Sequence, residues 1–239
     1  MKLILLLTIL AIIPQGWSVE EQVEIHASLC PASPKELLEL LERANGPAKQ
    51  RNIWYLDHQN LSLNDSGKIL RIRRDLNKNR VSITVKLRGQ DEVNVMKPDI
   101  ECEKDWYGER EKSSCSLDSS LPADEWEMAI QGKTSLITLF SSAQLHFLFE
   151  NNAVINWNKL RIFGPIKAHI WKYDDRTLEI WSMSNQTKHF EIYEVSTRAP
   201  LKYAKEVQHS LYEYLIGRGV KLCSDHESKT RTVLEFLSH

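Results

Sequence analysis

Short segments in which apolar residues alternate with charged or hydroxyl-bearing residues constrain the fold of this chain more than any other feature. The segment 81–88 reads VSITVKLR, 69–74 reads ILRIRR and 23–29 reads VEIHASL. Because successive side chains of a β-strand point to opposite faces of the sheet, each segment is expected to be a strand with one apolar and one polar face. The polar faces carry mainly cations, with an acidic version further on: Arg71, Arg73, Lys86, Arg88, Glu101 and Glu103.

These polar faces have two alternative environments. If they meet water, they are ordinary solvated sheet faces and nothing further follows. If they point into one closed barrel, the interior is lined with cations and a few carboxylates. Such an interior would hold a polyanion together with a metal ion, because converging cations and a hard metal offset the charge of an anion removed from water.

The composition and the first residues indicate one exported domain. Of 239 residues, 42% are hydrophobic and 26% are charged, which suits a single domain with a sizeable core over residues 19–239. Residues 1–18 have the form of a signal peptide, with Lys2, an apolar run over 3–13 and Pro14. The alternative is a retained membrane anchor, but the run is shorter than the roughly 20 residues that span a bilayer. We therefore expect a secreted or periplasmic protein without a membrane contact once the signal is removed.

The cysteines and the net charge narrow the class further. Four cysteines in an exported chain favour two disulfides, and three pairings are open. We favour Cys102 with Cys115, because the loop between them can bring them together, which leaves Cys30 with Cys223. The net charge of −1 argues against a general nucleic-acid partner, which needs a cationic excess.

The remaining pattern places a few helices among many strands. A helix is expected over 34–43, because Ser33 and Glu36 form a capping box with Pro34 at the first helical position. Further helices are expected over about 125–148 and over 200–216, and the Ser/Asp-rich segment 113–124 is expected to be a loop. Strands are expected at 52–57, 69–74, 81–88, 92–106, 166–173, 177–182, 189–196 and 230–237. This order is typical of an α+β fold with a mostly antiparallel sheet or barrel.

Seven motifs follow one another in an order known from one protein family. They are EIHAS at 24–28, WYLD at 54–57, GKILRIR at 67–73, SITVKLR at 82–88, ECE at 101–103, FEIYEV at 190–195 and SKTR at 228–231. Together they resemble the CYTH superfamily, the triphosphate tunnel metalloenzymes, which include class IV adenylate cyclases and thiamine triphosphatases. The likeness covers most of the chain after residue 18, and its most specific part is 54–73.

The resemblance implies a fold and a site. The fold is an antiparallel eight-stranded β-barrel, or tunnel, with flanking helices. The ligand is a triphosphate or polyphosphate anion, and the implied cation cradle consists of Arg71, Arg73, Lys86, Arg88 and Lys229. The implied cofactor is Mg²⁺ or Mn²⁺, held by Glu24 and Glu191.

The first and the late strands depart from the family pattern. His26 and Ser28 stand where relatives have Glu and Lys, which makes His26 a candidate substitute metal ligand. The second late carboxylate, Glu194, is displaced by one position, so Glu191 and Glu194 should point to opposite faces of a regular strand. Two functions follow as hypotheses. The chain is either a metal-dependent triphosphatase that binds inorganic triphosphate, polyphosphate or an organic triphosphate, or a non-catalytic polyanion-binding module that has lost its metal site.

Overall fold

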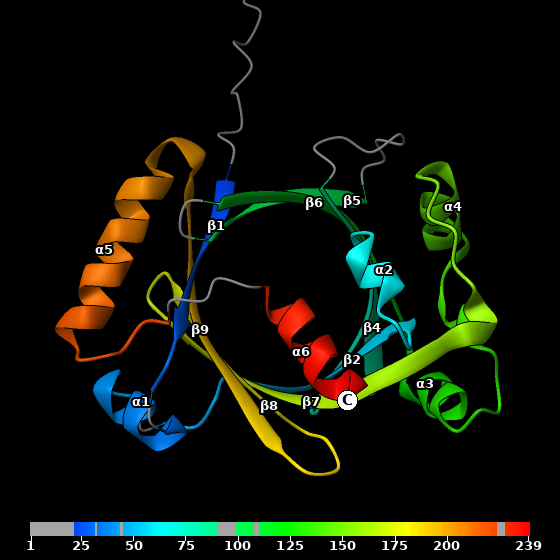
Figure 1. Ribbon diagram of the computed structural model, residues 1–239, viewed down its shortest axis with the longest axis horizontal. Coiled ribbons are helices and arrows are strands. Elements are labelled where there is room, and N and C mark those ends of the chain that lie inside the picture. Colours follow the sequence, from blue (N-terminus) through cyan, green and yellow to red (C-terminus); the bar gives the residue numbers. More distant parts are fainter. Residues whose placement is uncertain (1–21, 32, 44, 90–98, 108–109, 224–227) are drawn as a thin grey trace, which may run out of the picture.

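The computed structural model describes residues 22–31, 33–43, 45–89, 99–107, 110–223 and 228–239. Its centre is a closed barrel of nine strands with helices around it and within it (Figure 1). The strands are β1 Gln22–Leu29, β2 Lys49–His58, β3 Lys68–Asp75, β4 Arg80–Arg88, β5 Ile100–Tyr107, β6 Arg110–Pro122, β7 Leu160–Tyr173, β8 Arg176–Ser184 and β9 His189–Pro200. The predicted signal peptide, and residues 92–98 of the predicted strand 92–106, lie outside the described residues.

The order of the strands differs from the predicted one in two respects. Around the barrel the order is β1-β5-β6-β4-β3-β2-β7-β8-β9, and β9 pairs with β1 to close it. Eight of the pairings are antiparallel, but β1 and β5 run parallel, so the barrel is mixed. The expectation of an eight-stranded antiparallel barrel is therefore wrong in strand number and in one pairing, although the barrel and its α+β class are confirmed.

The additional strand is β6, which the sequence led us to expect as a loop. Its serines and its aspartate made 113–124 look like a turn region. In the structure Ser116 and Asp118 face the interior of the barrel, whereas Cys115 and Leu117 belong to an apolar cluster outside it. A strand whose inner face lines a polar cavity has few apolar residues, and this is why its pattern was missed.

Four of the described helices lie in two groups outside the barrel, one helix packs into the opening of the barrel, and a short helix lies at the turn between β2 and β3. Figure 1 shows α1 and α5 on one flank and α3 and α4 on the opposite flank, while α6 lies within the ring of strands. The bounds are α1 Pro34–Leu40, α2 Ser62–Asp65, α3 Ala123–Ile130, α4 Ser142–Glu150, α5 Ala204–Gly217 and α6 Lys229–Ser238, with 3-10 turns at Leu136–Leu139, Trp157–Lys159 and Leu201–Tyr203. Among the described helices, none has the length and apolar character needed to cross a membrane.

The C-terminal segment corrects another expectation, since residues 230–237 are helical and not a strand. Val233 and Leu234 are buried against inward-facing residues of the barrel, including Tyr55 and Trp181. The helix thus fills the apolar part of the interior. The β-branched residues of this segment favoured a strand, but burial of the apolar helix face inside the barrel outweighs that propensity.

The other helix predictions are confirmed in part. Ser33 caps α1 as expected, because its hydroxyl accepts a hydrogen bond from the backbone N–H of Glu36 at 3.1 Å. The long helix expected over about 125–148 is instead divided into α3 and α4, with a break at Gly132, whose φ is +71°. A backbone at this φ cannot continue a right-handed helix. Helix α4 begins with its own capping box, formed by Ser141 and Gln144.

The strands that alternate between apolar and polar residues have one apolar and one polar face, as predicted. The apolar faces of β2, β3, β4 and β6 pack against α3 and α4, and those of β1, β8 and β9 pack against α1 and α5. On β4, Ile83 and Val85 are fully buried in the outer cluster, while Lys86 and Arg88 line the interior. The barrel is therefore held by helices packed outside it, and this leaves its charged faces inside.

Both predicted disulfides are present. Cys102 and Cys115 face each other directly across the β5–β6 pair, with their Cα atoms 4.0 Å apart. Cys30 and Cys223, with Cα atoms 5.2 Å apart, connect the end of β1 to the segment that precedes α6. All four cysteines are thus paired.

Candidate functional site

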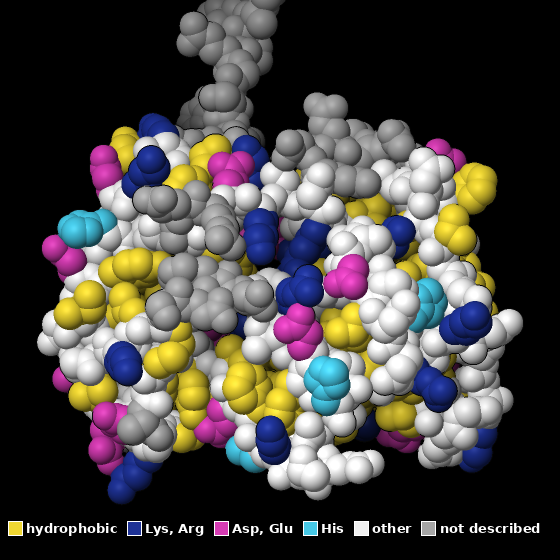
Figure 2. Space-filling model, in the orientation of Figure 1, with side chains coloured by type: hydrophobic (Ala, Val, Ile, Leu, Met, Phe, Trp, Pro, Cys, Tyr) yellow, Lys and Arg dark blue, Asp and Glu magenta, His cyan; other side chains and the backbone are white. Residues whose placement is uncertain are grey.

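A charged cavity of about 330 Å³ occupies the interior of the barrel. In the space-filling view, Lys and Arg side chains gather at the centre of the molecule, where the surface is hollowed beside α6 (Figures 1 and 2). All five cations predicted from the sequence line the cavity: Arg71, Arg73, Lys86, Arg88 and Lys229. Carboxylates from β1, β5, β6 and β8 face them: Glu24, Glu101, Glu103, Asp105, Asp118 and Glu179.

Three arginines of this set have mainly uncharged partners. Arg71 and Arg73 both reach the hydroxyl of Thr84, at 3.5 and 3.4 Å, and Arg88 donates to the hydroxyl of Ser228 at 3.0 Å. Within the described residues, the one ion pair formed by these three arginines joins Arg73 to Asp118, at 3.8 Å, and Arg88 is also one of the charges that lower the pKa of the buried Asp105. Burial and the neighbouring charge of Arg71 lower the pKa of Arg73 to about 10. In the described part of the chain Arg71 and Arg88 thus form no ion pair, and their guanidinium groups face the cavity, where an anion could contact them.

Gly67 determines where one of these arginines lies. Its backbone has a φ of +74°, and the Arg88 N–H donates to the Gly67 carbonyl at 2.8 Å. A Cβ atom at Gly67 would come within 2.8 Å of the Arg88 carbonyl oxygen. The turn before β3 thus holds the end of β4 in place, and glycine is needed for both its conformation and its close approach.

The two lysines, in contrast, are paired with carboxylates inside the cavity. Lys86 lies 2.6 Å from Glu103 and 3.7 Å from Asp105. Lys229, at the start of α6, lies 2.5 Å from Glu179 and 2.6 Å from Glu194. These lysines neutralise carboxylates that would otherwise be left unpaired in a partly dry interior.

Burial and charge act in opposite directions on the Lys229 group. Burial lowers the pKa of Lys229, but the charges of Glu179 and Glu194 raise it well above its ordinary value. Burial raises the pKa of Glu194, whereas Lys229 and His26 hold it down at about 2. The pKa of Glu179 is lowered for the same reason, mainly by Lys229 against the effect of burial. All three groups are therefore charged near neutral pH.

His26 lies on the wall opposite the arginines. Its ring stacks on Tyr107 with centroids 4.4 Å apart, and its Nδ1 is 3.0 Å from the Glu194 carboxylate. Its Nε2 is buried and, within the described part of the chain, has no hydrogen-bond partner; Asp105 is 3.5 Å away. Burial lowers the pKa of His26, but the interactions with Glu194 and Asp105 together outweigh this effect and raise it to about 10. Without a metal ion the carboxylates thus favour a positive charge at this position, and a metal ion at Nε2 would have to displace that proton.

The same wall contains a group of side chains that fits a divalent metal ion. Single ligand atoms of Glu24, His26 and Asp105 lie within 4.8 Å of one another. Carboxylate oxygen and imidazole nitrogen are both common ligands of divalent ions, and the unpartnered Nε2 supplies a donor directed into the group. The residues present therefore fit the metal that the sequence resemblance implied.

The predicted ligand Glu191 lies elsewhere. It is absent from the described residues that line the cavity, and its carboxylate accepts a hydrogen bond from the hydroxyl of Tyr193. Strand β9 pairs regularly with β8, so Glu194 faces Glu179 inside the barrel and Glu191 points the other way. A metal-binding role for Glu191 stays a prediction. Asp105 was missed, although it continues the inward alternation of Glu101 and Glu103.

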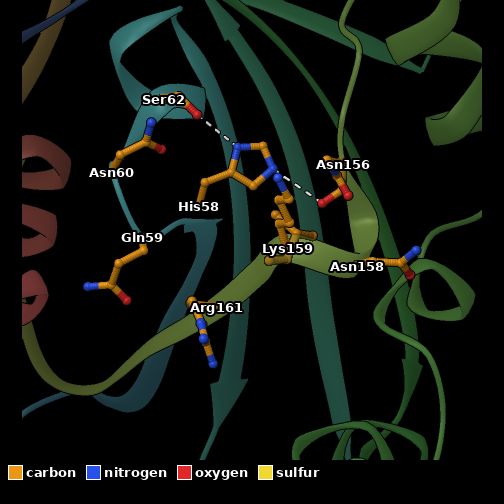
Figure 3. Close-up of a pocket in the computed structure, with 9 residues that line it drawn as sticks. His58, Gln59, Asn60, Ser62, Asn156, Asn158, Lys159 and Arg161 are labelled. Atoms are coloured by element: carbon orange, nitrogen blue, oxygen red, sulfur yellow. Dashed lines mark hydrogen bonds between the residues drawn. The ribbon is translucent and has the colours of Figure 1, made fainter.

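A second hollow lies outside the barrel between α2 and the start of β7. Figure 3 shows His58 between Ser62 and Asn156, with Lys159 and Arg161 nearby. Its Nε2 donates to the Asn156 carbonyl at 3.2 Å and its Nδ1 accepts from the Ser62 hydroxyl at 2.8 Å. Both ring nitrogens are therefore occupied. Since no carboxylate occurs among the described residues lining this hollow, it is a poor metal site, and the barrel interior is the stronger candidate.

Comparison with known proteins supports this fold. No protein-family model and no curated protein matches the chain. Among solved structures, the chain is similar to a Hippeastrum protein that was proposed to be an adenylyl cyclase and has a dominant triphosphatase activity. The TM-score is 0.61 and the identity 13%, and the alignment covers 90% of this chain and 95% of the Hippeastrum protein. The chain is also similar to a Bacillus halodurans protein proposed to be an adenylate cyclase, with a TM-score of 0.58, 16% identity and coverage of 89% and 97%. At these identities the likeness shows the fold alone, and adenylate cyclases and triphosphatases are the kinds of protein that the sequence resembles, so the resemblance is confirmed at the level of the fold.

Proposed function

We propose that this chain binds inorganic triphosphate, polyphosphate or an organic triphosphate inside its barrel and hydrolyses it as a metal-dependent triphosphatase. The observation that carries the proposal is the cluster of Arg71, Arg73 and Arg88 in the cavity, whose side chains reach mainly hydroxyl groups and of which, within the described residues, only Arg73 forms an ion pair, with Asp118. A triphosphate carries about four negative charges, and the planar guanidinium group binds phosphate oxygens through paired hydrogen bonds. The triphosphatase activity of the Hippeastrum protein with this fold supports the same proposal.

Each part of the cavity has a role in this proposal. The three arginines bind and orient the phosphate chain, and Lys86 adds positive charge beside them while it remains paired with Glu103. Glu24, His26 and Asp105 would hold the divalent ion, for which the resemblance implies Mg²⁺ or Mn²⁺. When bound, such an ion neutralises charge on the reacting phosphoryl group and lowers the pKa of a water molecule. The enclosing strands limit the access of bulk water, which strengthens the electrostatic interactions inside.

The alternative function is a binding module without catalysis. It is favoured by one observation, which is that the carboxylates Glu179 and Glu194 are already neutralised by Lys229. Carboxylates engaged in this way are less available to a metal ion. A chain of this kind would bind the polyanion through the arginine cluster alone.

We also propose that the protein is an exported single domain over residues 19–239. The two disulfides support an oxidising compartment, outside the cell or in a periplasm. The proposed partner is the phosphate anion, and a nucleic-acid partner is not part of the proposal, because the net charge is −1.

The proposal is tested by phosphate release from tripolyphosphate, measured on the oxidised chain with Mg²⁺, with Mn²⁺ and with a chelator. Arg73→Ala should lower kcat/KM by about 10- to 100-fold, since it removes a charge-assisted contact to the anion. Arg74→Ala is the matched control, because Arg74 is next to it on β3 but pairs outside the barrel with Glu127 at 2.8 Å. Its activity should stay within about twofold of that of the parent.

Three results separate the hypotheses. Metal-dependent release that is lost in Arg73→Ala establishes the triphosphatase. Binding of tripolyphosphate that persists in chelator, without release, establishes the binding module. Neither binding nor release in any condition overturns both functions.

A further inference from the structure

We propose that Glu24, His26 and Asp105 form a mixed nitrogen and oxygen metal site that selects divalent transition-metal ions over Mg²⁺. This inference rests on the proposed function in one respect, which is that the bound ion serves the hydrolysis of a triphosphate. It concerns the identity of the metal and of its ligands, and it replaces the purely carboxylate site that the sequence resemblance implied. Of Mg²⁺ and Mn²⁺, the site would hold Mn²⁺.

The parallel pairing of β1 with β5 creates the site. In this register Glu24 lies opposite Asp105, and His26 lies opposite Tyr107. Side chains at alternate positions share one face, so Glu24 and His26 both point inward and reach Asp105 across the pair. The three ligand atoms come within 4.8 Å of one another without any change in the backbone.

His26 has the surroundings of a metal-binding histidine. Glu194, which is 2% exposed, fixes the ring through Nδ1, and the stacking on Tyr107 fixes its plane. The other nitrogen, Nε2, is left without a hydrogen-bond partner in the described residues, although His26 is only 7% exposed. Histidine ligands commonly hydrogen-bond a carboxylate through the nitrogen that does not touch the metal. A buried imidazole with one nitrogen fixed and the other facing Asp105 at 3.5 Å without a hydrogen bond matches this arrangement.

Neighbouring cations orient the two carboxylates. Arg198 lies 3.5 Å from Oε2 of Glu24, and Lys86 lies 3.7 Å from Oδ2 of Asp105. The other oxygen of Asp105, Oδ1, faces His26. These carboxylates therefore differ from Glu179 and Glu194, which both contact Lys229 directly.

The imidazole determines the preference between metals. Mg²⁺ requires an octahedral set of oxygen ligands and keeps several water molecules. Imidazole suits later transition metals, and affinity at a site with nitrogen ligands rises from Mn²⁺ to Co²⁺. A site with one imidazole among three protein ligands should therefore bind Co²⁺ most tightly, then Mn²⁺, with Mg²⁺ the weakest of these three ions.

The test is calorimetric titration of the metal-free, oxidised chain with Co²⁺, Mn²⁺ and Mg²⁺, without any phosphate ligand. His26→Gln should weaken Co²⁺ binding by about 10-fold or more, whereas the affinity for Mg²⁺ should change by less than about twofold. The visible absorption of bound Co²⁺ should also change in this variant, which reports the loss of the nitrogen ligand. His209→Gln on the surface of α5 is the matched control and should behave as the parent does.

A second variant keeps the test decisive if His26→Gln does not fold. Glu24→Gln changes a more accessible ligand and should weaken the binding of all three ions. Equal affinities of the parent for Co²⁺ and Mg²⁺ would overturn the inference, as would unchanged Co²⁺ binding in a folded His26→Gln.

The proposed function fails by a different result. If Co²⁺ binds as expected but tripolyphosphate does not bind, the metal site stands and the function is wrong. If tripolyphosphate is hydrolysed and His26→Gln keeps the metal preference of the parent, the function stands and the metal site is wrong.

Discussion

At the scale of single residues, Lys229 connects the last helix to the charged interior. Its ammonium group is the shared partner of Glu179 and Glu194, and it also lies 4.7 Å from the ring of Trp181. The removal of one partner of a buried ion pair leaves the other charge uncompensated, which costs about 3–5 kcal/mol. Lys229→Met should therefore reduce the free energy of unfolding at neutral pH by about this amount, as measured by urea titration.

The control for this variant is Lys35→Met. Lys35 pairs with Glu39 at 3.8 Å on the surface of α1, with 86% of its side chain exposed. An exposed pair of this kind contributes between about 0 and 1 kcal/mol. A loss in Lys229→Met no larger than that in Lys35→Met would contradict the importance of the internal pairs.

The free energy of unfolding at acidic pH provides a second measurement on the same residues. Lys229 keeps the pKa of Glu179 below its ordinary value of 4.5, so folding favours the ionised carboxylate. This contribution is present above the unfolded pKa and is lost as the pH falls. Lys229 and His26 hold the pKa of Glu194 at about 2 against the effect of burial, so the parent should lose stability as the pH falls from 4.5 towards about 2. Lys229→Met should lose less, because its unpaired carboxylates gain from protonation.

At the scale of secondary-structure elements, the turn before β3 is a sensitive point. Gly67→Ala would place a Cβ 2.8 Å from the Arg88 carbonyl oxygen and would require a φ of +74° from alanine. Strain of this kind costs about 1–3 kcal/mol. We expect a corresponding decrease in the free energy of unfolding, together with weaker binding of tripolyphosphate, because Arg88 belongs to the arginine cluster.

Gly46→Ala is the matched control, since no atom lies within 4 Å of the added Cβ. It should leave stability within about 1 kcal/mol of that of the parent. If the two alanine variants unfold at the same denaturant concentration, the turn does not hold β4 as described.

The elements also show which strands and helices could be predicted from sequence patterns. Period-two alternation located β3 and β4 and identified their inner faces, because the helices outside the barrel demand an apolar face on every covered strand. The same rule failed at β6, where a polar interior leaves too few apolar residues to mark a strand. It also failed at α6, where burial inside the barrel outweighed β-branched composition.

The residues of the site could be predicted only where their inward orientation follows from the alternation along their own strand. Arg71, Arg73 and Lys86 line the cavity because their strands alternate regularly, and this is visible in the sequence. The approach of Asp105 to Glu24 depends on a parallel pairing between strands distant in the chain. No local pattern contains that register, so Asp105, the third member of the candidate metal group, was missed.

At the scale of the whole molecule, the two disulfides close loops of very different length. Cys30 and Cys223 are separated by 193 residues, and Cys102 and Cys115 by 13. In the chain-entropy account, the longer loop stabilises by about 5 kcal/mol and the shorter one by about 3 kcal/mol. Cys30→Ala/Cys223→Ala should therefore lower the free energy of unfolding more than Cys102→Ala/Cys115→Ala does, as measured by urea titration. The reverse order would show that strain or residual structure in the unfolded chain dominates.

The cavity wall is assembled from residues that range from Glu24 on β1 to Lys229 on α6. A ribosome that has produced β1 to β9 has still not supplied the lysine that neutralises Glu179 and Glu194. Because β9 closes the barrel against β1, a nascent chain contains no enclosed anion or metal pocket before β9 emerges, and Glu179 and Glu194 stay without their lysine until α6 does. If export follows as proposed, the polypeptide crosses a nucleotide-rich cytosol without sequestering its triphosphates, and its ligand chemistry begins only at its destination.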